Sequence, residues 1–139
     1  MYSYKNILYI VSVIASAEKA IHYSQNFTKA LEFLEANEQV YFNGSITLLI
    51  AIGEEVKKIE KELLQTNPSI EWQNISDMRN VLAHDYRGID EDIVFKVIKT
   101  DLPKLKLVMI EFLKAFPKNE VEVVLGTKRY KHLKGLFQL

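Results

Sequence analysis

The stretch from Asp77 to Tyr86 reads Asp-Met-Arg-Asn-Val-Leu-Ala-His-Asp-Tyr and places several chemically useful side chains close together. Arg79 is a permanent cation whose forked donors suit a phosphate and the charge that develops on it. His84 carries an imidazole, a group that titrates near neutral pH and can accept or donate a proton. With the amide of Asn80, these groups suffice for attack of an RNA 2′-hydroxyl on the adjacent phosphate, because the substrate supplies the nucleophile.

Helical spacing decides which of these side chains face the same way. Arg79 and His84 lie about 140° apart on one helix, so a single straight helix cannot aim both at one point. Asn80 shares a face with His84, with Asp77 nearby, whereas Tyr86 lies about 20° from Arg79. Two copies of the helix meeting across a two-fold axis would each supply the face that the other lacks. The spacing therefore predicts a site between the subunits of a homodimer.

The residues alone leave a structural alternative open. His84 would then balance the dipole at a helix end, and Arg79 would form an ordinary ion pair. Two further histidines, His22 and His132, are interpreted as surface or capping residues.

Composition excludes several other kinds of chemistry. The chain has no cysteine, which excludes disulfides, a thiolate nucleophile and a cysteine zinc site. It has no phosphate-binding glycine-rich loop, no Gly-x-Ser-x-Gly turn and no histidine pair with metal-ligand spacing. We therefore expect neither a cofactor nor a metal. The 18 basic and 18 acidic residues balance, so any nucleic-acid site has to be local.

The elements that would position these residues are helices. A chain of 139 residues is the size of one domain, and only 5 glycines and 3 prolines interrupt it. Hydrophobic periodicity and capping residues, with Thr28 and Asp90 as candidate N-caps, predict an all-α, up-and-down helical bundle. The helices are expected over about residues 4–25, 28–36, 46–63, 68–86 and 90–113, with Pro103 kinking or splitting the last one.

Two segments need separate interpretation. The apolar run over residues 7–17 is too short to span a bilayer and continues into charged residues, so we interpret it as a buried helix rather than a signal peptide. We expect a cytoplasmic protein that does not bind membranes.

Residues 1–118 are assigned to the bundle and 119–139 to a C-terminal extension, in which Val121, Val123 and Val124 favour a strand. The basic residues that end this extension are interpreted as a solvated tail, with contact to an RNA backbone as the alternative.

The motif resembles a known family. Arg79 to Tyr86 is similar to the Arg-x-x-x-x-His-x-Tyr motif of HEPN-domain proteins, specifically of the HepT-like toxins. Trp72 leads into the motif as it does in that family. Other similar segments, in the same order, are Ile52-Gly53-Glu54, Gly88-Ile89-Asp90 and Asp101-Leu102-Pro103. Together they cover about residues 45–115.

The resemblance implies a fold and an activity. The fold would be a HEPN-like bundle that forms a homodimer with a cleft between the motif helices. The activity would be metal-independent cleavage of RNA, with tRNA as a candidate substrate. This cleavage would arrest growth. Arg79 and His84 would be catalytic with Asn80 assisting, and Glu54 and Asp77 would support them.

The resemblance also implies a partner, a minimal nucleotidyltransferase antitoxin. In such pairs the antitoxin can transfer AMP to the motif tyrosine, here Tyr86, which would add bulk and negative charge beside Arg79. Two other functions stay open. One is a non-catalytic HEPN subunit that binds nucleotide or substrate for a nucleotidyltransferase complex, and the other is a structural dimerisation bundle.

Overall fold

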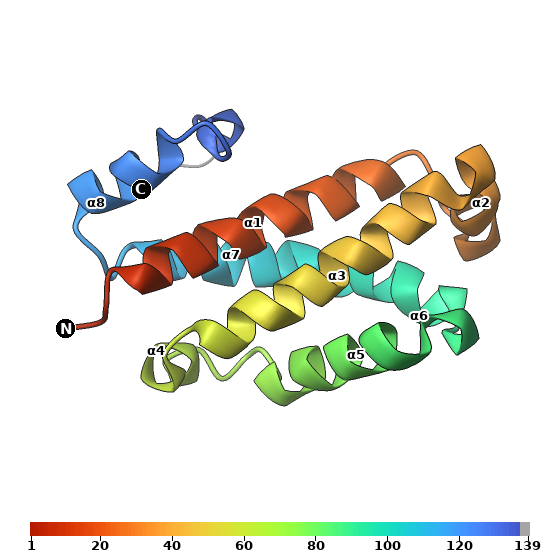
Figure 1. Ribbon diagram of the computed structural model, residues 1–139, viewed down its shortest axis with the longest axis horizontal. Coiled ribbons are helices and arrows are strands. Elements are labelled where there is room, and N and C mark those ends of the chain that lie inside the picture. The colour runs from red at the N-terminus through yellow and green to blue at the C-terminus, as the bar shows by residue number, and fades with distance from the viewer. Residues whose placement is uncertain (137–139) are drawn as a thin grey trace.

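The structure is a computed structural model that describes residues 1–136, except for the side chain of Tyr86. The described residues form helices and turns, with no strand among them. Four helices run alternately up and down, as Figure 1 shows: α1 (Lys5–Ser24), α3 (Val40–Lys58), α5 (Trp72–Asp85) and α7 (Leu102–Leu113). The predicted all-α, up-and-down bundle is therefore confirmed.

Helix α1 lies at the centre of the molecule, which explains its unusually apolar sequence. It packs against α3, α7 and the C-terminal helix α8 (Lys118–Leu125). Ile10, Val11 and Ile14 are fully buried. The prediction that residues 7–17 form a buried helix is thus confirmed. No helix in the described part of the chain is long and apolar enough to cross a membrane.

The prediction of one helix through residue 63 is wrong, because the chain breaks between α3 and α4 (Lys61–Gln65). Ile59 and Glu60 are extended, and Ile59 is buried. The buried Asn6 side chain stabilises this break. Its oxygen accepts the Glu60 N–H at 2.9 Å, and its amide donates to the Glu60 carboxylate at 2.6 Å. Asn6, which lies 54 positions earlier in the sequence, thus accepts a hydrogen bond from a backbone N–H group that the break leaves without a helical partner.

Other helix ends also differ from the prediction. Helix α2 (Ala30–Glu35) has no side-chain cap, so Thr28 does not cap it. A 3-10 segment, Ala36–Gln39, follows α2 and contains left-handed residues, after which α3 begins at Val40 rather than near residue 46. Helix α5 begins at Trp72 rather than near residue 68 and is followed by the 3-10 turn Tyr86–Gly88.

Pro103 changes the local helix type without splitting the helix. Asp90 caps α6 (Glu91–Lys96), as predicted, by accepting the Asp92 N–H at 2.8 Å. A π-helical segment, Val97–Asp101, then leads directly into α7. Because proline lacks an N–H to donate to the preceding turn, the helix changes its hydrogen-bond spacing just before Pro103.

The C-terminal extension is helical, so the predicted strand is wrong. Val121 and Leu125 in α8 are buried, whereas Val123 is 71% exposed. This spacing of four residues places both buried side chains on one helix face, which packs on α1. Burial thus decides the conformation against the weak strand preference of valine. After the 3-10 turn Lys131–Leu133, residues 137–139 of the extension lie outside the described part.

Candidate active site

Helix α5 carries the motif and lies along one side of the bundle (Figure 1). The Trp72 indole N–H donates to the Asn67 carbonyl at 3.2 Å, and its ring stacks on Phe112 of α7 with centroids 5.9 Å apart. Leu82 is fully buried, and it is the one buried residue among the described side chains of α5. These contacts fix the start and the inner face of α5 while most of its motif remains accessible.

Arg79 lies directly over Gly53 of α3. A Cβ atom at Gly53 would stand 2.3 Å from the Cβ of Arg79 and 2.7 Å from its Cγ. Such distances are far shorter than van der Waals contact, so α3 and α5 approach this closely only because residue 53 has no side chain. Gly53 therefore sets the position of the arginine that the motif supplies.

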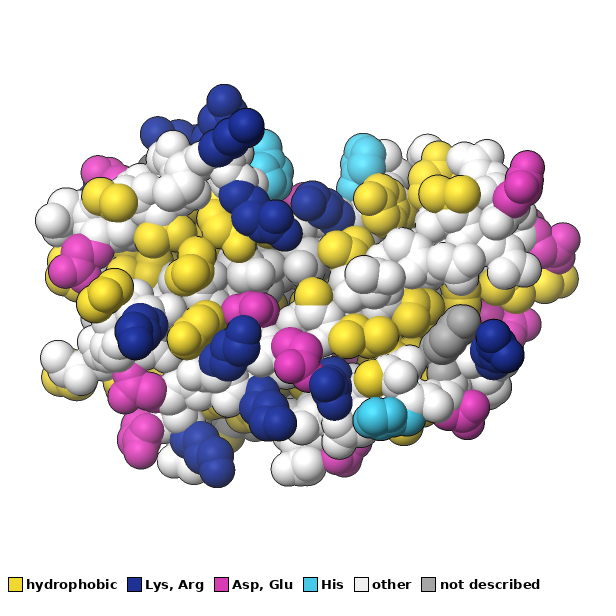
Figure 2. Space-filling view, viewed as in Figure 1, with side chains coloured by type: hydrophobic (Ala, Val, Ile, Leu, Met, Phe, Trp, Pro, Cys, Tyr) yellow, Lys and Arg dark blue, Asp and Glu magenta, His cyan; other side chains and the backbone are white. Residues whose placement is uncertain are grey.

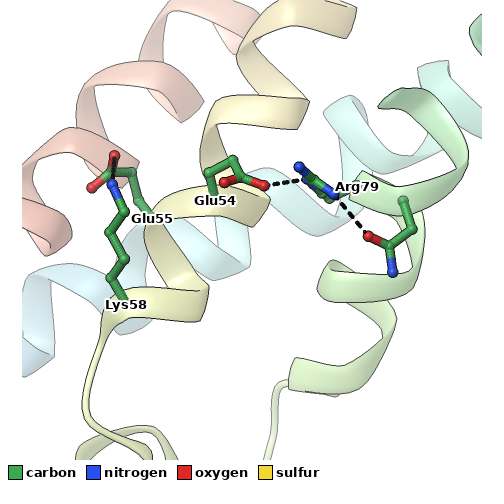
Figure 3. Close-up of polar contacts among 5 residues, drawn as sticks. Glu54, Glu55, Lys58 and Arg79 are labelled. Carbon is green, nitrogen blue, oxygen red and sulfur yellow. Dashed lines mark hydrogen bonds and ion pairs between the residues drawn. The ribbon is translucent and has the colours of Figure 1, made fainter. Parts of the chain in front are cut away.

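The Arg79 guanidinium is held from two sides. Its Nε forms an ion pair with Oε1 of Glu54, and its Nη1 donates to Oδ1 of Asn80 at 3.0 Å (Figure 3). The Arg79 side chain is 29% exposed and that of Glu54 is 39% exposed. The paired Nε and Oε1 atoms are themselves out of contact with solvent. Glu54 therefore orients a cation that solvent and ligands can still reach.

His84 and Asp77 lie apart from this cluster. Both are exposed on the outer side of α5, and the Gln73 amide donates to Asp77 at 2.9 Å. No hydrogen bond or ion pair among the described residues engages the His84 imidazole. Because α5 is continuous from Trp72 to Asp85, the angle of about 140° between Arg79 and His84 applies. Within one chain, the structure joins Arg79 to Glu54 and Asn80 but not to His84.

The sequence profile of the family described as "Ribonuclease HepT-like" matches residues 14–112, which include the whole of α3, α5 and the contact between them. The chain belongs to the HepT-like ribonuclease family. The predicted membership of the HepT-like HEPN family is therefore confirmed. The C-terminal extension lies beyond the match.

Individual proteins named as ribonucleases are also similar to this chain. "Putative RNase MJ1380" of Methanocaldococcus jannaschii is 30% identical over 99 residues, 70% of this chain and 87% of that protein. "Probable ribonuclease HepT" of Thermococcus cleftensis is 32% identical over 90 residues, 63% of this chain and 81% of that protein. No solved structure gives a significant match.

A cavity of about 410 Å³ opens on another side of α5 and does not include the HepT-like motif. Asn74, Ile75 and Met78 line it from α5, together with residues of α3 and of the π-helical segment. None of Glu54, Arg79, Asn80 or His84 lines it. Within residues 1–136, no three His, Asp or Glu side chains are grouped so that they could hold a metal ion.

Sequence reasoning did not anticipate the part that Gly53 plays. The predicted helix over residues 46–63 includes Gly53, and the family resemblance includes it only as one member of Ile52-Gly53-Glu54. A glycine inside a strongly periodic helix is itself a signal, because it costs helix stability unless something packs closely against it. The side chain of Tyr86 is not among those that the structure describes. Its position on the same face as Arg79 therefore stays a prediction.

Proposed function

We propose that this protein is a metal-independent endoribonuclease toxin of the cytoplasm, acting through an Arg/His site between the two subunits of a homodimer. One observation carries the proposal: Glu54 fixes the guanidinium of Arg79 beside Asn80, while the His84 imidazole on the same helix is exposed and has no hydrogen-bond partner among the described residues. Membership of a ribonuclease family supports RNA as the substrate.

The proposed reaction is attack of an RNA 2′-oxygen on the adjacent phosphorus. His84 takes the 2′-hydroxyl proton as the new P–O bond forms, and the resulting imidazolium can protonate the 5′-oxygen as the P–O5′ bond breaks. Arg79 binds the phosphate and stabilises the charge that builds on its oxygens. Asn80 assists by holding the guanidinium, and Glu54 fixes its orientation before substrate binds.

The exposure of α5 supports a second copy as the missing half of the site. Its outer side carries His84 and Asp77, and Val81 there is 48% exposed. A two-fold axis beside this surface would bring the His84 of one copy towards the Arg79 of the other. The same contact would remove Val81 from water.

Cleavage of RNA in the presence of EDTA tests the proposal. Purified protein is expected to cut a tRNA at the same rate with and without excess EDTA. A 2′-deoxy nucleotide at the cleaved position is expected to block the cut, because it removes the nucleophile. Absence of cleavage by a folded dimer would instead favour the non-catalytic nucleotide- or substrate-binding subunit, and dependence on added metal would contradict metal independence.

We further propose that a minimal nucleotidyltransferase antitoxin neutralises the toxin by modifying Tyr86. The phenol oxygen would attack the α-phosphorus of ATP, so that AMP is transferred and pyrophosphate leaves. The added negative charge would compete with RNA for Arg79. Incubation with the cognate transferase and ATP is expected to add mass in AMP units to the parent and none to Tyr86→Phe. An unchanged mass with an active transferase would contradict this step alone.

A further inference from the structure

The C-terminal extension contains a short, folded segment that has several basic residues and no acidic one. We call residues 126–136 the basic segment. It contains four basic residues and no acidic one, so the other 128 residues hold 14 basic and 18 acidic side chains. The net charge of zero is therefore the sum of a positively charged C-terminal segment and a negatively charged remainder of the chain. Its basic residues are Lys128, Arg129, Lys131 and Lys134.

The basic segment is anchored to the bundle rather than trailing from it. Tyr130 is 7% exposed and Leu133 is 1% exposed, and both belong to the hydrophobic core. The backbone N–H groups of Tyr130 and Lys131 donate to the Thr127 carbonyl at 3.1 and 2.9 Å, and that of Leu133 donates to the Tyr130 carbonyl at 2.9 Å. Up to residue 136 the segment is therefore folded against the bundle and is not a loose tail, although its basic side chains are exposed to solvent, as expected.

The four cations face solvent without an acidic partner in the described part of the chain. All four side chains are exposed, and no ion pair within residues 1–136 neutralises any of them. Figure 2 shows Lys and Arg side chains gathered over the segment that Figure 1 draws in blue. A fixed backbone that presents unpaired cations loses little conformational entropy when an anion binds.

We infer that the basic segment is a second RNA-binding surface, which holds the phosphate backbone of the substrate at a distance from the site that cuts it. This inference rests on the proposed function for the identity of the polyanion. Tyr130 and Leu133 of the basic segment point into the core, and Leu136, at 50% exposed, is its one exposed large apolar side chain, whereas a membrane-binding segment would present several apolar side chains outward. RNA is therefore favoured over an anionic lipid surface.

The arrangement of the helices predicts which substrates the basic segment affects. Helix α8 packs on α1, α1 packs on α3, and α3 packs on α5, so the basic segment and α5 lie on opposite sides of the bundle (Figure 1). A dinucleotide at Arg79 cannot reach the basic segment of the same subunit. A folded RNA such as tRNA is large enough to contact both, so the basic segment should lower KM for long substrates only.

The test compares two quadruple variants that lose the same charge. One replaces Lys128, Arg129, Lys131 and Lys134 by Gln. The control replaces the exposed Lys5, Lys29, Lys61 and Lys118 by Gln. Binding of fluorescent tRNA is measured against KCl concentration in a His84→Ala background, so the substrate stays intact and the measurement does not require a cleaving enzyme.

Loss of the basic segment's charge is expected to weaken tRNA binding at least about tenfold at 0.1 M salt and to reduce the slope of log K against log salt by about 2 to 3. The control should change both far less. In the cleaving protein, KM for tRNA should rise while dinucleotide cleavage stays unchanged. Equal salt slopes in the two quadruple variants would overturn the inference. It would also be overturned if the basic-segment variant lost binding to phosphatidylserine vesicles but bound tRNA as the parent does. If the parent protein binds tRNA but does not cleave it, the proposed function is overturned, whereas the inference that the basic segment binds RNA is unaffected.

Discussion

Alanine in place of His84 is expected to slow RNA cleavage at least about 100-fold, the usual contribution of a positioned general acid–base group. The protein should fold and dimerise as before, because His84 is exposed and no described side chain hydrogen-bonds to it. The rate is measured with labelled tRNA, and the fold is checked by thermal unfolding.

A matched control is available on α1. His22 is also exposed and its imidazole contacts only Gln25 among the described hydrogen bonds, so His22→Ala should cleave at the parent rate. A His84→Ala protein that cuts as fast as the parent would remove His84 from the mechanism.

The companion substitution at Arg79 separates charge from geometry. Arg79→Lys retains a cation but not the planar fork that reaches Glu54 and Asn80 together. We expect Arg79→Ala to lose about 100-fold or more in rate, as for other donors to a developing oxyanion, and Arg79→Lys to recover little of it. Full recovery in Arg79→Lys would show that charge alone suffices.

The second large effect is expected from Gly53→Ala. Its new Cβ would stand 2.3 Å from the Cβ of Arg79, so α3 and α5 have to separate or Arg79 has to move. Overpacking of this kind costs about 1–3 kcal/mol of unfolding free energy, which outweighs the gain of about 0.5–1 kcal/mol from replacing a helical glycine. Cleavage should fall at least about tenfold, because Arg79 leaves its position. Urea unfolding and the tRNA assay measure the two effects.

Gly44→Ala on the same helix is the control. A Cβ there would meet Tyr23 at 3.4 Å, an ordinary contact. The variant should therefore gain up to about 1 kcal/mol in unfolding free energy and retain its activity. Equal stability and equal activity in the Gly53 and Gly44 variants would refute the close approach of α3 and α5.

Helix order followed from local signals, whereas several helix ends did not. The Asp90 cap and the apolar periodicity of α1 and α5 are properties of neighbouring residues, so the sequence alone predicts them. The break at Ile59 depends on Asn6, which becomes its neighbour only in the folded chain. The helix at Val121 likewise depends on burial against α1, which overrides the preference of valine for strands.

In the candidate site, too, some features follow from local sequence and others depend on how the helices pack. The spacing of Arg79 and His84 on one helix predicts that they face apart, because that angle is fixed by helix geometry. The contact of Arg79 with Gly53 depends on how α3 packs against α5, and no local pattern encodes that distance. Only the fold therefore identifies Gly53 as the residue that positions the guanidinium.

The central claim is that the guanidinium of one subunit and the imidazole of the other act on one phosphate. The most direct measurement uses a purified heterodimer with Arg79→Ala in one subunit and His84→Ala in the other. Such a heterodimer holds one intact pair across the two-fold axis, so it is expected to cut tRNA at about half the parent rate, while each mutant homodimer is inactive. A heterodimer as inactive as the two homodimers would contradict a site shared between subunits.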